Sequence, residues 1–316
     1  MNQHDPRTRI THAAALLLLS LLWAADSLRV DLLPSYVFSA SPPFLGAAIP
    51  LAFFALAAAI LALLRRSTWP SRKQALSALW IALGLFVAPA WLLHLTHGSV
   101  PSLTRVALFS LVPVFAVVFE PHMDPEASRP SFGLAASLAA VFGMLLLFGF
   151  ETPASLTAAA EQCALILAAA LIAAANCLAV RATRTLPRAS LSSFAFFVAA
   201  TACALLIASG FLAGEFPLHA AAFAPAILWS LLVDFPALAL LFWLFPRLSA
   251  LRMTTRFLFA PLFAALVSAL IFAPHVSLIA ALGLLLVAAS ATWLLFAPAH
   301  SSHTPHDPAP LRLHRD

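Results

Sequence analysis

Charged residues are scarce in this sequence of 316 residues. Asp, Glu, Lys and Arg make up 9% of it, whereas apolar residues make up 63% and the mean hydropathy is +0.98. A soluble domain has about a quarter of its residues charged and about half apolar. No stretch is both long and polar enough to form a separate soluble domain. This composition excludes a water-soluble globular fold and predicts a single domain embedded in a membrane.

Cysteine is also rare, and the motifs of common catalytic sites are missing. Cys163, Cys177 and Cys203 all lie within apolar stretches without CxxC spacing, so we interpret them as packing residues and not as a metal or disulfide set. The sequence has no Walker motif, no HExxH and no GxSxG. We therefore expect no cofactor, no metal, no nucleic-acid partner and no ATP-driven step within this chain. These absences also argue against an enzyme.

Apolar runs separated by Pro, Gly and charged residues account for most of the chain. Crossing about 30 Å of hydrocarbon takes about 20 helical residues. The runs predict an all-α integral membrane protein of ten transmembrane helices, over residues 12–33, 44–64, 75–96, 102–120, 131–150, 157–180, 191–213, 220–245, 253–273 and 276–297.

The distribution of cations predicts how these helices are oriented, because Lys and Arg near helix ends favour the cytoplasm. Of the 17 cations, all except Arg29 and Arg105 fall in the two tails or in the connections that follow even-numbered helices. Arg256 is counted here with the connection before the ninth helix. The pattern predicts cytoplasmic N- and C-termini, and the polar, Pro-rich stretch 300–316 is expected to be a disordered cytoplasmic tail. Short loops and frequent Ala, Leu and Arg indicate a bacterial inner (plasma) membrane.

The two halves of the chain resemble each other at an offset near 150 residues. The segment 22–30 aligns with 172–180, so that Asp26 falls on Asn176, and 113–116 aligns with 261–264. Repeated units indicate a repeat architecture. Because each unit has an odd number of helices, the second enters the membrane from the opposite face. We therefore predict two inverted five-helix repeats, over residues 12–150 and 157–297, which is an arrangement common in secondary transporters.

Several segments resemble the EamA-like family of the drug/metabolite transporter superfamily. They are the Leu-Leu-Trp-Ala opening of the first helix, the Arg-Arg end of the second, the stretch 99–116 in the fourth and the stretch 247–264 in the ninth. The resemblance covers about residues 12–297. It implies a ten-helix protein of two inverted repeats that transports small molecules.

The leading functional hypothesis is therefore a secondary transporter of small metabolites or amino acids, working by alternating access as an exporter. Its partners are a small-molecule substrate and the lipid bilayer. The alternative is an intramembrane lipid-linked transferase, and a third interpretation is a membrane scaffold that transports nothing. The sequence does not indicate the oligomeric state.

Ionisable side chains within a membrane helix are costly and usually face the protein interior, so they are candidate functional residues. Asp26 lies in the outer half of the first helix with Arg29 at i+3, on the same helical face. It is either a substrate or proton-coupling group or one partner of an ion pair with Arg29 or Arg105. Its repeat mate Asn176 is a candidate for the same reason.

Asp234 lies deeper, near the middle of the eighth helix, and Pro236 follows it. Proline removes a backbone donor and bends a helix, so nearby carbonyls can face a cavity. Asp234 either couples protons and binds substrate or is held by a neighbouring hydroxyl or Arg. Pro89 marks a similar break in the third helix, and paired interrupted helices are typical of a transporter site.

Polar residues near the predicted outer surface form a weaker set of candidates. Arg105 either attracts an anionic substrate group or extends to the outer headgroups. His94 either shuttles protons or is an interfacial polar residue.

Two tryptophans and one acidic segment remain. Trp23 and Trp229 either line a cavity or fill helix interfaces. The acidic segment 120–126 is expected to be a solvated cytoplasmic turn and not a metal site.

Overall fold

The structure is a computed structural model, which describes residues 6–32, 43–96, 100, 102–124, 129–130, 132–149, 152–153, 155–215, 226–272, 277–297 and 299–300. These residues are helical almost throughout. The helices are α1 (Pro6–Leu32), α3 (Pro43–Leu64), α4 (Arg72–Ala82), the π-helix η1 (Leu83–Val87), α5 (Ala88–Leu95), α6 (Ser102–Phe109), α7 (Val112–Met123), α8 (Gly133–Phe148), α9 (Leu156–Thr185), the 3-10 helix η2 (Arg188–Ser190), α10 (Leu191–Leu212), the π-helix η3 (Ser230–Asp234), α12 (Phe235–Leu244), α13 (Ala250–Thr254), α14 (Arg256–Phe272) and α15 (Leu278–Phe296).

The predicted class, an all-α integral membrane protein, is confirmed. Nine helical segments within the described residues are long and apolar enough to cross a membrane, namely Arg7–Leu28, Pro43–Leu64, Arg72–Leu95, Leu103–Met123, Leu156–Thr185, Arg188–Leu212, Ala226–Leu244, Ala250–Ile271 and Leu278–Phe296. The apolar helix α8 is shorter, with 16 residues. Helices therefore occupy all ten predicted ranges, although α1 begins earlier, at Pro6, and α9 continues to Thr185.

The described residues outside the helices include one pair of two-residue strands. Strand β1 (Arg129–Pro130) pairs antiparallel with β2 (Ala299–His300). The first residue of the predicted disordered tail, His300, therefore pairs with Arg129, and residues 301–316 lie outside the described part of the chain.

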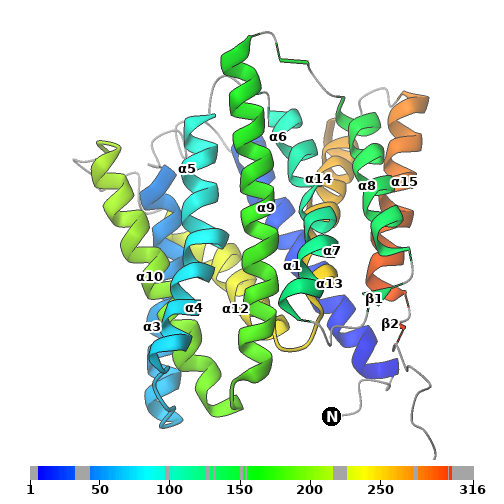
Figure 1. The fold of residues 1–316 in the computed structure, drawn as a ribbon. Coiled ribbons are helices and arrows are strands. Elements are labelled where there is room, and N and C mark those ends of the chain that lie inside the picture. Colours follow the sequence, from blue (N-terminus) through cyan, green and yellow to red (C-terminus); the bar gives the residue numbers. More distant parts are fainter. Residues whose placement is uncertain are drawn as a thin grey trace, which may run out of the picture.

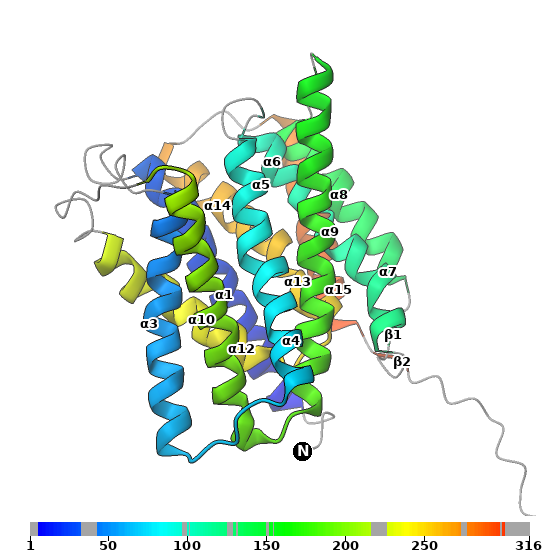
Figure 2. The same cartoon turned by 60° about the vertical axis from the view of Figure 1, so that its left-hand side comes forward.

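Helices that are far apart in the sequence form the main packing pairs (Figures 1 and 2). Helix α3 packs on α10, α8 on α15, α1 on α14, and α7 on α9. Helices α4 and α5 pack along α9, and α12 packs on α1. Each of these pairs joins a helix before residue 150 to one after residue 155. The two halves of the chain are therefore interleaved in one bundle.

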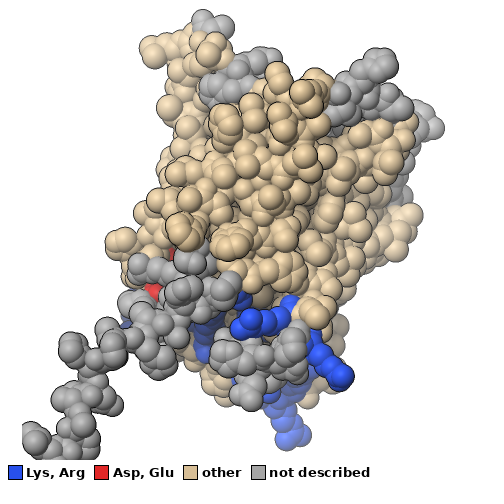
Figure 3. Space-filling view, turned by 90° about the vertical axis from the view of Figure 1, so that its right-hand side faces the viewer, with Lys and Arg blue, Asp and Glu red and all other residues tan. Residues whose placement is uncertain are grey.

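Cations gather at one end of the bundle, where α3 and α9 end and α4 begins. We call this the basic end. It is the lower end in Figure 3, where Lys and Arg cluster below a surface of uncharged side chains. Its cations include Arg65, Arg66, Arg72, Lys73, Arg181, Arg184, Arg188 and Arg247.

Two carboxylates cap helices of the other half of the chain. The side chain of Glu120, at the basic end of α7, accepts hydrogen bonds from the backbone N–H groups of Ala250 at 2.8 Å and Leu251 at 3.2 Å. Glu215, just after α10, accepts them from Phe44 and Leu45, both at 3.0 Å, at the start of α3. The first N–H groups of a helix have no intrahelical partner and attract negative charge. The expectation of a solvated acidic turn is therefore wrong for Glu120, which lies in a helix and is buried.

Two π-helical turns each precede a proline by two residues. Helix η1 comes before Pro89 and η3 comes before Pro236. A proline ring clashes with the carbonyl four residues earlier and leaves that carbonyl without its partner. A π-turn widens the helix locally and relieves that conflict. Both predicted helix breaks are thus present as π-turns, in the third and eighth of the ten helices.

The pair α8 and α15 depends on glycine at its contact. A Cβ atom added to Gly283 would lie 2.7 Å from the carbonyl oxygen of Gly143 and 2.8 Å from the backbone nitrogen of Leu147. A Cβ added to Gly143 would lie 2.9 Å from the carbonyl oxygen of Gly283. Small residues allow membrane helices to approach closely and gain dispersion energy. These two glycines therefore set the distance between the two helices.

We expect Gly283→Val to force α8 and α15 apart and to lower the free energy of unfolding by about 1–3 kcal/mol, because overpacking strains both backbones. Unfolding by denaturant in mixed micelles, followed by tryptophan fluorescence, measures the change. The control is Leu282→Val on the exposed face of the same helix. Equal stability of Gly283→Val and the control would contradict the close contact.

Candidate functional site

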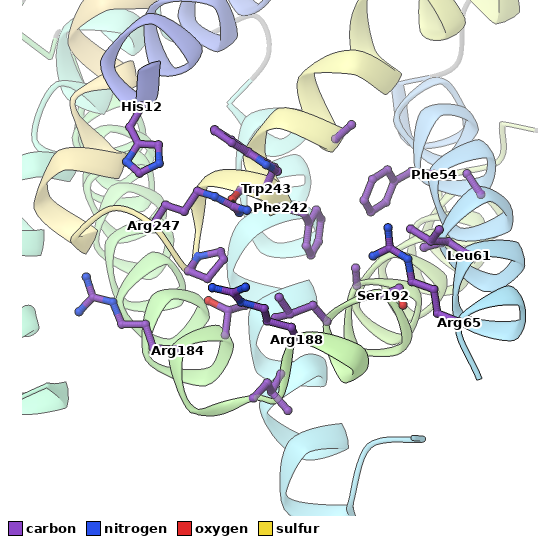
Figure 4. A pocket seen from close by; sticks show the side chains of 18 of the residues that line it. His12, Phe54, Leu61, Arg65, Arg184, Arg188, Ser192, Phe242, Trp243 and Arg247 are labelled. Atoms are coloured by element: carbon purple, nitrogen blue, oxygen red, sulfur yellow. The ribbon is translucent and has the colours of Figure 1, made fainter. Parts of the chain in front are cut away.

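A partly open cavity of about 700 Å³ lies at the basic end (Figure 4). Its walls come from both halves of the chain: α1 and α3 from the first, and α9, α10 and α12 from the second. The lining residues are Thr8, His12, Phe54, Ala57, Ala58, Leu61, Arg65, Thr183, Arg184, Leu186, Arg188, Leu191, Ser192, Ala195, Phe235, Ala239, Phe242, Trp243, Pro246 and Arg247.

Aromatic rings form the apolar wall of this cavity. Phe54 of α3 stacks on Phe242 of α12 with ring centroids 4.9 Å apart, and it also contacts Phe235 at 6.2 Å. Trp243 continues the same wall. Offset and tilted ring pairs at these separations pack more favourably than their area alone provides. The wall thus offers a preformed apolar surface to a bound molecule.

Arginines surround the opening of the cavity. In Figure 4 the guanidinium groups of Arg65, Arg188 and Arg247 approach the central space from three sides, whereas Arg184 points away. Arg184 is held by an ion pair with Asp124 at 3.0 Å and by a hydrogen bond to the carbonyl of Leu248. Within the described part of the chain, no Asp or Glu lines the cavity.

Arg247 is fixed against the aromatic wall. Its guanidinium carbon lies 4.1 Å from the centre of the Trp243 ring, and the same group donates a hydrogen bond to the Trp243 carbonyl. Burial, followed by the positive charge of Arg188, lowers the pKa of the Arg247 guanidinium. Both causes disfavour the charged form, and an arginine nevertheless stays charged in proteins because its ordinary pKa is so high. A bound anion would offset both costs.

A second polar cluster lies deeper, where α1, α9 and α14 meet. Arg256 is 1% exposed. Its Nη2 donates to Oδ1 of Asn176 at 2.8 Å and its Nη1 donates to the Met253 carbonyl at 2.7 Å, while its Nε has no hydrogen-bond partner among the described residues. The rings of Trp23 and Phe257 lie 4.9 and 4.8 Å from its guanidinium carbon. A buried guanidinium is thus held by an amide, a carbonyl and two ring faces.

The placement of Arg256 corrects the sequence interpretation of this residue. It is not a cation of the connection before the ninth helix, because it is the first residue of α14 and is buried against α1 and α9. Asn176, which was singled out as the repeat mate of Asp26, is its hydrogen-bond partner and is fully buried. Trp23, predicted either to line a cavity or to fill an interface, packs on the guanidinium.

The structure brings together two other predicted residues. The indole Nε1 of Trp229, just before η3, donates to Oδ1 of Asp26 in α1 at 3.0 Å. Asp26 is half-buried and lies one helical turn after Trp23. The side chain of Arg29 lies outside the described residues, so its predicted ion pair with Asp26 is not addressed. Helix α1 therefore contributes to two polar contacts, one with α14 and one with the eighth helix.

The remaining predicted residues lie apart from these clusters. Oδ2 of Asp234 accepts a hydrogen bond from the Ser230 hydroxyl at 3.2 Å, within η3. His94 is exposed at the end of α5, with its ring 5.0 Å from that of Phe44. Arg105 is half-buried in α6. None of these three lines the cavity.

Comparison with known proteins gives a fold and no function. No family model matches the chain, and no curated protein matches it. Among solved structures, 21 chains match. One is the crystal structure of a protein without a functional name, which has a TM-score of 0.68 and 17% sequence identity, over 90% of this chain and 98% of its own. At that identity the likeness shows a shared fold alone.

We expect Asn176→Leu to lower the free energy of unfolding by about 2–3 kcal/mol, because it removes an acceptor from a buried charged donor. Arg256→Met in the same background is expected to restore part of the loss, since the unsatisfied charge is then gone. A double-mutant cycle in micelles measures the coupling, expected to be at least about 1 kcal/mol. Strictly additive effects would show that the hydrogen bond between these side chains contributes nothing to stability.

Proposed function

We propose that this protein is a secondary transporter of small metabolites, built as two inverted five-helix repeats and related to the EamA-like family. The observation that carries the proposal is the position of the cavity, which lies between helices of both halves of the chain and is accessible at one end. Secondary transporters of inverted-repeat design bind substrate between their halves and expose the site to each side in turn.

The packing pairs support the inverted repeat. In each half the first helix packs on the fourth helix of the other half: α1 on α14, and α9 on α7. The second helices pack on each other, as α3 on α10, and so do the fifth, as α8 on α15. If each helix is replaced by its counterpart in the other half, the same set of pairs results. Two copies of one unit related by a two-fold axis would pack in this way.

The two π-turns support the same relation. Helices η1 and η3 occupy the third helix of each half, and each precedes a proline by the same number of residues. Such turns are frequent at functional sites, and interrupted helices in corresponding positions are typical of transporters. They are candidate positions at which the third and eighth helices bend when the cavity changes its exposure.

The distribution of charge supports the proposed orientation of the protein in the membrane. By the positive-inside tendency the basic end faces the cytoplasm, which places the N-terminus there and makes the cavity an inward-facing one. A cavity that loads from the cytoplasm suits an exporter working by alternating access in a bacterial inner membrane.

Flux measurements in proteoliposomes test the proposal. Labelled amino acids and organic acids are loaded as a pool, and their efflux is followed with and without a pH gradient. We expect gradient-dependent efflux of at least one compound. Absence of flux from well-folded, correctly inserted protein would argue against the transporter and favour an intramembrane lipid-linked transferase, which an assay with lipid-linked substrates would detect.

A matched pair of variants tests the role of Asp26 in the same assay. Asp26→Asn keeps an acceptor for the Trp229 indole but cannot titrate, whereas Trp229→Phe removes the donor and keeps the carboxylate. If Asp26 carries the coupling proton, the first variant loses gradient dependence and the second retains it. Loss of activity only in Trp229→Phe would instead assign Asp26 a role in joining α1 to the eighth helix.

A further inference from the structure

We propose that the cavity at the basic end binds an organic anion, a carboxylate or phosphate attached to an apolar body that carries no ammonium group. This inference rests on the proposed function and narrows its substrate class. It follows from two features found together, a ring of guanidinium groups at the opening and an aromatic wall beside it.

The charges select the polar part of the ligand. Arg65, Arg188 and Arg247 extend toward one space from three different segments of the chain (Figure 4). Guanidinium groups bind carboxylate and phosphate through short, charge-assisted hydrogen bonds, often in pairs. Asp124 neutralises Arg184, which points away from this space, and none of the described residues that line the cavity is a carboxylate. Arg65 and Arg247 therefore present positive charge to a ligand at the opening.

The aromatic wall selects the apolar part. Beside the arginines lie three buried or half-buried rings, those of Phe54, Phe235 and Phe242. These rings offer a ligand apolar surface and no hydrogen-bonding group. Ligand pockets commonly combine such a surface with a few placed polar groups. An inorganic ion would use the arginines alone, whereas an anion with an apolar body would contact both surfaces.

The same arrangement disfavours amines and zwitterions. A buried ammonium group is stabilised best by a carboxylate that neutralises its charge. None of the described residues that line the cavity is a carboxylate, and the guanidinium of Arg247 already lies over the ring of Trp243, the aromatic type that binds cations best. Asp26 and Asp234 are not lining residues. A free amino acid would therefore bring a cation into a space that already repels cations.

Arginine at a cytoplasmic helix end also has a purely topological explanation, because positive residues fix the orientation of a membrane protein. The chain supplies matched controls. Arg66 follows Arg65 directly, and Arg181 precedes Arg184 by one helical turn, yet neither lines the cavity. Topology depends equally on cations inside and outside the cavity, whereas ligand binding depends only on those that line it.

The experiment measures binding to the full chain in nanodiscs of phosphatidylcholine. The probes are radiolabelled 3-phenylpropionate, L-phenylalanine and 2-phenylethylamine, which share a ring and a short chain and differ in charge, together with phenyl phosphate. We expect the two anions to bind at least about tenfold more tightly than the zwitterion and the amine. Arg65→Gln and Arg247→Gln are expected to weaken anion binding about tenfold, while Arg66→Gln and Arg181→Gln change it less than about twofold.

Repeating the measurement with phosphatidylglycerol in the nanodisc distinguishes two sources of the anion. If phosphatidylglycerol weakens probe binding to the wild type but not to Arg65→Gln, a lipid headgroup is the natural occupant. If phosphatidylglycerol does not weaken probe binding to the wild type, the occupant is a soluble organic anion. Both results keep the anion site.

Three results would overturn the inference. They are failure of both anions to bind a protein that elutes as a single folded species, equal binding of the zwitterion or the amine, and equal losses in Arg65→Gln and Arg66→Gln. Because binding is measured without flux, anion binding with no transport would overturn the proposed function and leave the cavity's specificity standing.

Discussion

Peptide N–H and C=O groups within a membrane have no water to bind, so each must find its partner inside the protein. Regular helices meet this requirement except at their ends and at prolines, and those are the places where this chain uses special contacts. Glu120 and Glu215 supply acceptors to helix starts that belong to the other half of the chain. The turns η1 and η3 adjust the backbone before Pro89 and Pro236. The hydrogen bonds of Glu120 and Glu215 also join the two halves of the chain.

The requirement extends to side chains and explains the composition of the core. The buried hydroxyls of Ser20, Ser137 and Thr183 each donate to a carbonyl four residues earlier in their own helix. Among the described side chains Arg256 is one of two exceptions, the other being Oε2 of Glu161; the Nε of Arg256 has no hydrogen-bond acceptor there. Its charge is stabilised by Asn176 and two ring faces instead of a carboxylate. Packing of α1, α9 and α14 around this buried charge therefore depends on Asn176 and on the rings of Trp23 and Phe257.

The helices could be predicted because hydropathy is a local property of about twenty residues, and the ten ranges contain helices. Contacts between helices were less accessible to prediction. Asp26 and Asn176 were matched by the predicted repeat, yet they bind different partners, Trp229 and Arg256. Arg256 lies within the predicted ninth range, 253–273, yet it was counted with the cations of the preceding connection, because cation counting includes residues near a helix end.

The cavity could not be predicted from the sequence, for a geometric reason. Cation counting assigns Arg65 and Arg66 to the same side of the membrane and cannot tell which of them faces inward. That distinction depends on the rotation of α3 about its axis and on the turn that follows it, in which Arg66 has a left-handed backbone with φ of 49°. Glu120 was misassigned for a related reason, since its partners lie 130 residues away in sequence.

The arginines of the cavity also bear on the energetics of moving a ligand across the membrane. A bacterial cytoplasm is electrically negative, and one elementary charge gains about 2.3 kcal/mol for each 100 mV that it crosses downhill. If the chain exports an anion as proposed, that anion moves down the potential. Export of a monovalent anion at 100 mV would then sustain roughly a fiftyfold concentration difference without any co-transported ion. Uptake of the same compound would have to work against it.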